Sequence, residues 1–192
     1  MDGDLGTSVS NRKVFLASGS PRRQYLLEQS GFSVVVEPQD ADETWPGGDP
    51  GVAAQQIALR KIHSAGPQDL PVIGADTVVV LDGIPLGKPQ TAREAHEMLG
   101  ALSGKCHLVI TGVGIATASE ERSFSVSTRV WFRDLSSEEI ARYVDSGDCF
   151  DKAGSYGIQS GGSVLVDRVE GSYTNVIGLP LRETLEALEG MV

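Results

Sequence analysis

Short apolar runs alternate with amphipathic segments along the first half of the chain. An apolar run over 14–17 stops at a Ser-Gly-Ser-Pro turn, and apolar residues then recur at helical spacing up to Gly31. This pattern predicts a strand, a tight loop and a helix. A second strand is predicted over 33–37, followed by a long acidic loop, rich in proline and glycine, over 38–50.

Capping signals predict further helices. Asp49 and Pro50 fit the N-cap and first position of a helix that runs to about residue 63, because proline there loses no needed hydrogen bond. The capping-box pattern occurs twice and predicts helices that end near 104 and 147. A last helix is predicted from Pro180. The capping-box residues are Thr91, Glu94, Ser136 and Glu139.

The β-forming segments are concentrated in the middle of the chain. The segment 70–81 is strongly β-forming, with an expected interruption at 74–77, and Asp82-Gly83 then predicts a tight hairpin turn. Two long strands are expected over 106–118 and 122–132, joined as a hairpin, and another over 163–169. Strands and helices mix without strict alternation, which predicts a mixed α/β sheet with a substantial antiparallel part.

Composition narrows the class of protein. The 192 residues, 40% of them hydrophobic, suffice for one domain, predicted over 13–192 after a loose polar tail over 1–12. The two cysteines, Cys106 and Cys149, form no CxxC pair. The chain opens without a signal-like apolar stretch and has no membrane-length apolar run. We therefore expect a soluble cytoplasmic protein that has no membrane partner.

The charge balance argues against nucleic acid as a partner. The formal net charge is −10. A negatively charged protein is repelled by the polyanionic backbone of a nucleic-acid duplex. A few cations gathered in one cleft can still bind a small anion.

The turn at 18–23 is the first candidate site. Small residues precede a helix whose first amides point outward, which is the outline of an anion site, although Ser20-Pro21 could also be a simple cap. Arg22 and Arg23 are cations at the positive end of the helix dipole, where each should lower the stability of the fold by about 0.3 to 1 kcal/mol. We therefore expect them to face an anion such as a phosphate chain, and expect no loss of stability when either is removed.

Carboxylates form the second candidate group. Asp40, Asp42 and Glu43 lie within one short loop, which is either a solvated acidic loop or part of a site for a hard cation such as Mg²⁺. Asp76 lies inside an apolar β-forming run, where an unpaired carboxylate is costly. It could take a proton from water or hold a metal.

Cations and a glycine-rich loop complete the candidates. Lys61, Lys88 and Lys152 could bring positive charge to the same place, although each could equally be a surface lysine. Gln159 follows a glycine-rich stretch, 151–157, that would let backbone approach a ligand. Its amide could read the edge of a base, unless the segment is an ordinary flexible loop.

Taken together, these segments resemble the Maf family of nucleotide pyrophosphatases over nearly the whole chain. The motifs, in order, are LASGSPRRQYLL, DADET, GADTVVVLDG, LGKPQTAREAHEML, LSGKCHLVITGV, DKAGSYGIQ and EGSYTNVIGLPL. The resemblance implies a Maf-like, inosine-triphosphatase-like fold, with a largely antiparallel mixed sheet, flanking helices and a cleft between two lobes. It also implies hydrolysis of nucleoside triphosphates to monophosphate and pyrophosphate with a divalent cation, Mg²⁺ or Mn²⁺.

The resemblance also implies roles for single residues. Asp76 would activate water or hold the metal with Glu43. The GADT and YGIQ motifs resemble the dTTP/UTP pyrophosphatase branch, whereas the branch with GSDQ prefers 7-methyl-GTP. One departure is Ile62, because the family usually has a small residue after Lys61. The remaining implied residues are Ser18, Arg22 and Arg23 for phosphate binding, Lys61 and Lys88 for charge neutralisation, and Arg22, Thr77 and Gln159 for substrate choice.

Two further expectations concern the whole protein. The resemblance implies a homodimer. The alternative function is a non-catalytic module that senses a nucleotide or regulates septum formation in division, and retention of both Asp76 and Glu43 argues against it.

Overall fold

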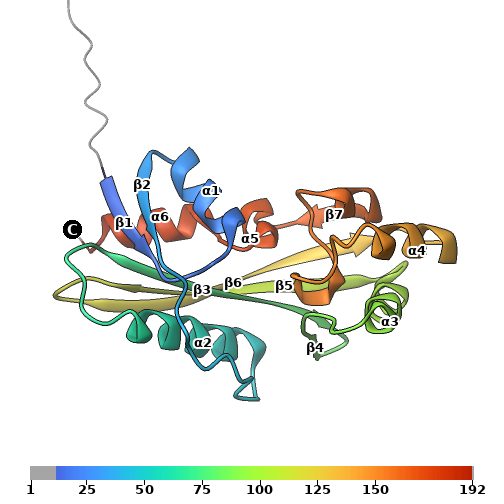
Figure 1. The fold of residues 1–192 in the computed structure, drawn as a ribbon, viewed down its shortest axis with the longest axis horizontal. Helices are drawn as coiled ribbons and strands as arrows, with labels where there is room; N and C mark the ends of the chain where they lie inside the picture. Colours follow the sequence, from blue (N-terminus) through green and yellow to red (C-terminus); the bar gives the residue numbers. More distant parts are fainter. Residues whose placement is uncertain (1–11, 192) are drawn as a thin grey trace, which may run out of the picture.

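A central mixed sheet organises the computed structural model, which describes residues 12–191 (Figure 1). The strands run in the order β2-β1-β3-β5-β6-β7, and β4 pairs with β3. The β1–β2 and β1–β3 pairs are parallel and the other pairs are antiparallel, as predicted for a largely antiparallel mixed sheet. The strands are β1 (Arg12–Leu16), β2 (Phe32–Val36), β3 (Val72–Leu81), β4 (Ile84–Leu86), β5 (Cys106–Ala116), β6 (Glu121–Phe132) and β7 (Val166–Glu170).

Helices cover the sheet on both faces. The α-helices are α1 (Pro21–Gln29), α2 (Pro50–Ser64), α3 (Ala92–Leu102), α4 (Ser137–Asp145), α5 (Tyr173–Ile177) and α6 (Leu181–Glu189), and the short 3₁₀ helices are η1 (Ala153–Ser155) and η2 (Gly161–Leu165). In Figure 1, α2 lies under the sheet and α1, α5 and α6 lie above it. Within the described residues, no helix combines the length and apolar character needed to cross a membrane.

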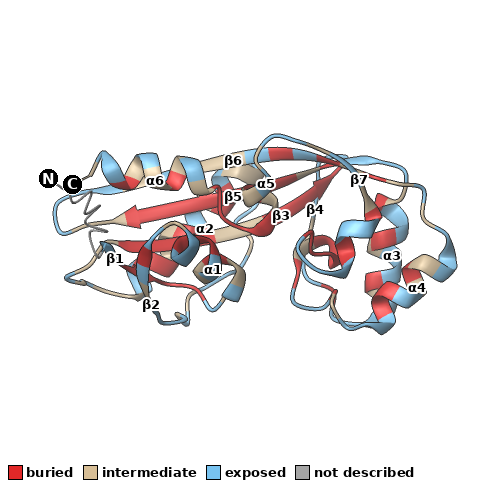
Figure 2. Cartoon of the chain, turned by 90° about the horizontal axis from the view of Figure 1, so that it is seen from above, coloured by how far each residue is buried: buried red, intermediate tan, exposed pale blue. Residues whose placement is uncertain are grey.

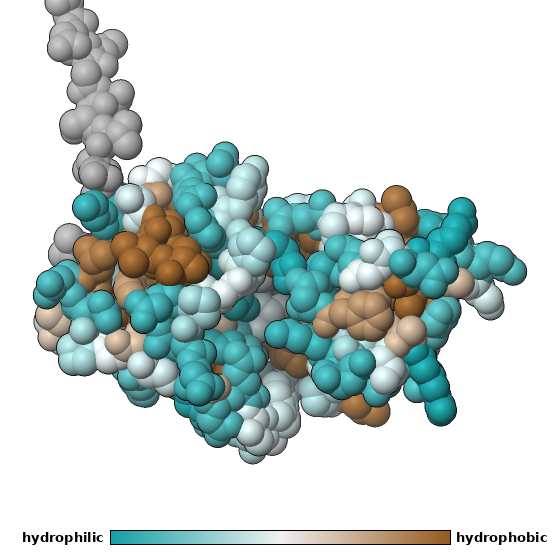
Figure 3. Space-filling view, in the orientation of Figure 1, coloured by the Kyte–Doolittle hydropathy of each residue, from teal (hydrophilic) through white to brown (hydrophobic). Residues whose placement is uncertain are grey.

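Two lobes share the long strands (Figure 2). One end of β3, β5 and β6 carries α3 and α4, and the other end carries β1, β2, α1, α2 and α6. Each lobe has its own buried cluster, with Leu99 and Phe132 in the first and Leu16 and Leu27 in the second. Most of the face drawn in Figure 3 is hydrophilic; the largest group of hydrophobic side chains lies at the β1–β2 end, and smaller ones lie on the other lobe.

Two glycines let α2 pack directly on the sheet. A Cβ at Gly74 of β3 would lie 2.6 Å from the Ala58 carbonyl oxygen, and a Cβ at Gly112 of β5 would overlap the backbone of Ala54 and Gln55. Any larger residue would push α2 away. The close approach places the polar end of Lys61 at the middle of β3.

The local signals in the sequence are largely confirmed. The Asp49 side chain accepts a hydrogen bond from the Val52 amide and caps α2. The capping box of Ser136 and Glu139 is complete at the start of α4. The Asp82-Gly83 turn joins β3 to β4 with positive φ at both positions, 51° and 80°. At Thr91 only one of the two capping-box hydrogen bonds forms, from the Glu94 amide to the Thr91 hydroxyl. The Glu94 carboxylate accepts from the Gln90 amide and not from the Thr91 amide.

Other expectations for the elements were wrong. The predicted interruption at 74–77 is absent, because β5 pairs with β3 from Val72 to Val80 and keeps the strand continuous. The first half of the predicted strand 163–169 belongs to η2. Helix α5 was not predicted, although Ser172 caps it. Arg12 opens β1 instead of ending the tail, and the rest of the predicted tail lies outside the described residues.

Candidate active site

A cleft of about 390 Å³ receives side chains from both lobes, within the usual range of roughly 300 to 1,000 Å³ for small-molecule sites. All nine residues to which the family resemblance assigns a role line it. These residues are Ser18, Arg22, Arg23, Glu43, Lys61, Asp76, Thr77, Lys88 and Gln159. Residues separated by more than a hundred positions in the sequence therefore meet in one place.

The sheet topology explains where the cleft lies. Strand β1 pairs with β3 at Val72 and Ile73, and β4 pairs with β3 over 79–81. The stretch 74–78 lies between these pairings and carries Asp76. The carboxyl end of β1 leads directly into the loop before α1, so the start of that helix faces the same opening.

Lys61 joins the two carboxylates in the cleft. Its side chain is 8% exposed, and its Nζ lies 2.9 Å from Asp76 Oδ1 and 3.0 Å from Glu43 Oε1. It also donates to the Ala75 carbonyl at 3.3 Å. Partial burial alone would raise the pKa of Glu43, but the charge and hydrogen bond of Lys61 outweigh burial and hold the pKa below its usual value. Glu43 is therefore ionised at neutral pH.

The acidic loop divides into two parts. Glu43 lines the cleft, whereas Asp40 and Asp42 do not. The Asp42 carboxylate accepts from the Thr44 amide at 2.9 Å and pairs with Arg60 at 3.4 Å. The solvated-loop interpretation therefore holds for Asp40 and Asp42, and the predicted group of three carboxylates does not form.

The donors present fit a divalent cation that arrives with a polyphosphate. Within residues 12–191, no group of three or more His, Cys, Asp and Glu side chains could hold a metal ion. The bonds to Lys61 engage one oxygen each of Glu43 and Asp76. Mg²⁺ commonly binds one or two carboxylates together with substrate phosphates and water, which matches this pair.

The start of α1 offers backbone amides to an anion. Ser20 is the N-cap, but its side chain makes no capping hydrogen bond, and Pro21 follows it. Ser18 Oγ accepts from the Ser20 amide at 3.3 Å. The amides of the first turn have no partners within a helix, and a phosphate group is a suitable acceptor for them.

Arg23 is a buried part of the architecture. Its guanidinium donates to the Gly178 carbonyl at 2.8 Å, to Ser18 Oγ at 2.8 Å and to Thr77 Oγ1 at 3.1 Å. Burial lowers the pKa of Arg23. The guanidinium ties α1 to β3 and to the end of α5. These hydrogen bonds argue against the expectation that its removal leaves stability unchanged, because the dipole argument left out the acceptors on Ser18, Thr77 and Gly178.

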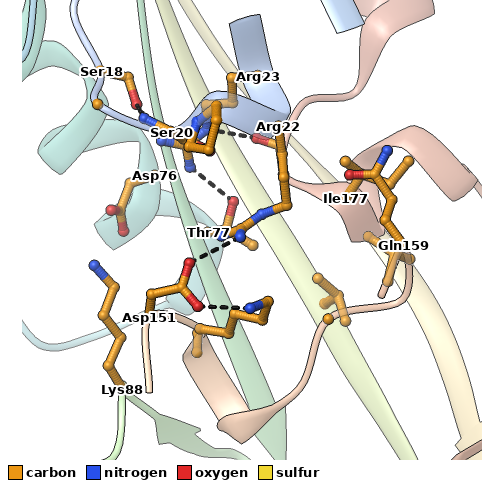
Figure 4. A pocket seen from close by; sticks show the side chains of 18 of the residues that line it. Ser18, Ser20, Arg22, Arg23, Asp76, Thr77, Lys88, Asp151, Gln159 and Ile177 are labelled. Carbon is orange, nitrogen blue, oxygen red and sulfur yellow. Dashed lines mark hydrogen bonds and ion pairs between the residues drawn. The ribbon is translucent and has the colours of Figure 1, made fainter. Parts of the chain in front are cut away.

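Arg22 points into the cleft instead (Figure 4). Its Nη1 lies 2.9 Å from Asp151 Oδ2. Asp151 Oδ1 lies 2.6 Å from Lys152 Nζ, which is itself buried and 3.0 Å from Asp148 Oδ1. Lys152 is thus paired with the carboxylates of Asp148 and Asp151. Lys88, in contrast, extends toward Asp76 in Figure 4.

Gln159 lies on the other side of Arg22 from Asp76 and Lys88 (Figure 4). It is exposed and lies beside Ile177, which also lines the cleft. The Thr77 hydroxyl lies 3.0 Å from Thr111 Oγ1 and accepts from Arg23. The cleft therefore has a charged side, suited to phosphates, and a side with an amide and apolar groups, suited to a base.

A family model described as Maf-like protein matches residues 13–191. The chain belongs to the Maf family. It is 44% identical to a dTTP/UTP pyrophosphatase of Aliivibrio fischeri, over 92% of this chain and 96% of that protein. It is 46% identical to one of Salmonella typhimurium, over 91% of each chain. The solved structure of the Staphylococcus aureus Ham1 protein matches with a TM-score of 0.52 at 15% identity, over 94% of this chain and 100% of that one, which supports the expected fold.

Two features of this Maf protein escaped the sequence argument. The role of Asp151 as the partner of Arg22 depends on a contact across the cleft that no local pattern shows. His107 lies in the expected strand 106–118 and was not a candidate site residue, yet its Nε2 lies 2.8 Å from the hydroxyl of Tyr156, which lines the cleft. Burial lowers the pKa of His107 to about 4, so it is neutral and is suited to shaping the cleft wall.

Proposed function

We propose that this protein hydrolyses dTTP and UTP to the nucleoside monophosphate and pyrophosphate, by attack of water at the α-phosphorus. The observation that carries the proposal is the Asp76–Lys61–Glu43 arrangement in a cleft that Arg22 and the start of α1 also face. The naming of the relatives as dTTP/UTP pyrophosphatases supports it.

The positive groups of the cleft would bind the triphosphate. Arg22, Lys88 and the first-turn amides of α1 offer donors in one region, and guanidinium groups pair well with phosphate oxygens. The Ser18 hydroxyl can donate a hydrogen bond to a phosphate oxygen, since its oxygen already accepts one from Arg23. Arg23 then acts chiefly by holding Ser18 and Thr77 in place.

Asp76 would take the proton of the attacking water. The water oxygen forms a bond to the α-phosphorus, the bond from that phosphorus to the bridging oxygen breaks, and pyrophosphate leaves. Lys61 fixes one oxygen of Asp76, which orients the carboxylate. General-base catalysis of this kind contributes roughly 10² to 10⁴-fold in rate.

Glu43 and Asp76 would hold the divalent cation that the family implies, Mg²⁺ or Mn²⁺. When bound with the substrate, such a cation neutralises developing charge on the phosphates. Glu43 is suited to this because it remains ionised beside Lys61.

Substrate choice would depend on the far side of the cleft. The Gln159 amide can both donate and accept, so it can pair with a pyrimidine edge. Thr77 contributes through Arg23, since its hydroxyl faces that guanidinium. Together with Arg22 these residues would favour dTTP and UTP.

The experiment is a panel of canonical and modified nucleoside triphosphates, with Mg²⁺ or Mn²⁺ and a pyrophosphate readout. Release of pyrophosphate that is fastest from dTTP and UTP supports the proposal. Tight nucleotide binding without turnover would favour the alternative, a nucleotide-sensing or division-regulating module.

We further infer from the resemblance that the protein works as a homodimer. From its cysteines, apolar pattern and net charge of −10 we infer a cytoplasmic protein without a nucleic-acid or membrane partner. Both cysteines are free, which fits a reducing compartment. A monomer mass measured by light scattering at working concentration would contradict the inferred homodimer.

A further inference from the structure

An ion pair crosses the mouth of the cleft. Arg22 belongs to α1 in one lobe, and Asp151 belongs to the segment before η1 in the other (Figure 4). Their charged groups lie 2.9 Å apart, although 129 positions separate them in the sequence. The other oxygen of Asp151 receives a hydrogen bond from Lys152 at 2.6 Å. One carboxylate thus bridges two cations on opposite walls.

This carboxylate occupies the position that a phosphate oxygen would need. A guanidinium binds carboxylate and phosphate through the same donor geometry, so the two anions compete for Arg22. The Arg22 side chain is 26% exposed and that of Asp151 is 62% exposed, so an incoming ligand can reach the pair. An ion pair this exposed is weak enough to be exchanged.

Asp151 is ionised at neutral pH. Partial burial alone would raise the pKa of Asp151, but hydrogen bonds from Lys152 and Arg22 outweigh it and lower the pKa to about 2. Once Arg22 turns to a phosphate, this fixed negative charge remains beside the polyanion. It therefore opposes retention of any phosphate ligand in the cleft.

We propose that Asp151 is a positioning residue that competes with phosphate for Arg22, holding Arg22 across the cleft before the substrate binds and taking it back when pyrophosphate leaves. The inference rests on the proposed function, because it assigns Arg22 to the phosphates. It predicts that the carboxylate weakens the binding of pyrophosphate and so limits product inhibition.

The test is the affinity for inorganic pyrophosphate, measured by calorimetry on the full chain with Mg²⁺. Asp151→Asn should bind pyrophosphate roughly two- to fivefold more tightly than the wild type, the upper part of the range expected for an exposed ion pair. A structural defect would weaken binding instead. Asp69→Asn is the control, because it makes the same charge change at an exposed position outside the cleft. Its affinity should match the wild type.

A double-mutant cycle ties the effect to Arg22. In an Arg22→Ala background, Asp151→Asn should give a smaller gain, because the competition for Arg22 is then absent and only the repulsion between Asp151 and the ligand is removed. Asp151→Glu, which restores the charge, should return the affinity toward that of the wild type. If Asp151→Asn melts at lower temperature, Asp151→Ser serves as the second neutral variant.

The outcomes separate this inference from the proposed function. Unchanged or weaker pyrophosphate binding in both neutral variants, or an equal gain without Arg22, would overturn the role of Asp151. A wild type that binds pyrophosphate but hydrolyses no nucleotide would overturn the proposed function. The competition between Asp151 and pyrophosphate for Arg22 could still be measured.

Discussion

Lys61 Nζ lies 2.9 Å from Asp76 Oδ1, and the contact exists because glycine at position 74 lets α2 lie against β3. The same nitrogen holds Glu43 at 3.0 Å. A buried cation thus sets the position of both carboxylates that the proposed chemistry requires.

Replacing Lys61 by Met should lower turnover by about a hundredfold or more, since it leaves Asp76 and Glu43 without their shared partner. Lys61 lowers the pKa of Glu43, so its loss raises that pKa. The acidic limb of the pH–rate profile should therefore move to higher pH. Lys13→Met, at an exposed position of β1, is the control and should leave the profile unchanged. An unmoved acidic limb in Lys61→Met would show that Lys61 does not tune the site.

Asp76→Asn should lower turnover by about two to four orders of magnitude, because it keeps the volume and removes the proton-accepting charge. Lys61 keeps Glu43 and the Ala75 carbonyl as partners, so the fold should survive. Circular dichroism and the melting temperature check the fold beside the kinetic assay. Near-normal turnover in a folded variant would remove Asp76 from the mechanism.

Replacing Arg23 should lower the stability of the fold, whereas replacing its neighbour Arg22 should weaken substrate binding. Arg23→Ala leaves buried acceptors unpaired and should cost about 1 to 3 kcal/mol of stability. For a chain of this size, that lowers the melting temperature by roughly 2 to 4 °C per kcal/mol. Arg22→Ala should leave the melting temperature nearly unchanged and raise the KM for dTTP. Equal melting temperatures for the two variants would contradict the buried role of Arg23.

Gln159→Ala should reduce the preference for dTTP and UTP over ATP and GTP more than it slows the best substrate. A mispaired amide costs about 1 to 3 kcal/mol, so this contact can supply roughly ten- to a hundredfold discrimination. The measurement is kcat/KM for the four nucleotides, with Gln24→Ala, at a partly buried position of α1 that does not line the cleft, as control. An equal loss of rate on every nucleotide would assign Gln159 to the loop or the chemistry instead.

Local chemistry explains what could be predicted from the sequence. The Asp49 cap, the Ser136–Glu139 box and the Asp82-Gly83 turn depend on neighbours within four positions, so the pattern of residues determines them. That residues distant in the sequence lie together in the cleft could be predicted, because motif matching to a family carries information about distant contacts that periodicity lacks.

Long-range contacts explain what could not. The sequence pattern around Asp76 predicts a break in the strand, but pairing with β5 and the bond to Lys61 make a continuous strand possible. The prediction from the helix dipole assumes that Arg23 is an exposed cation. In the structure Arg23 is buried and donates a hydrogen bond to the Gly178 carbonyl, 155 positions away. Such partners are set by the fold as a whole.

The most direct test of the central claim is hydrolysis of dTTP in water labelled with oxygen-18, followed by mass spectrometry of both products. Attack at the α-phosphorus predicts one labelled oxygen in the thymidine monophosphate and unlabelled pyrophosphate. Label in the pyrophosphate, release of single inorganic phosphate groups, or no hydrolysis at all would contradict the account.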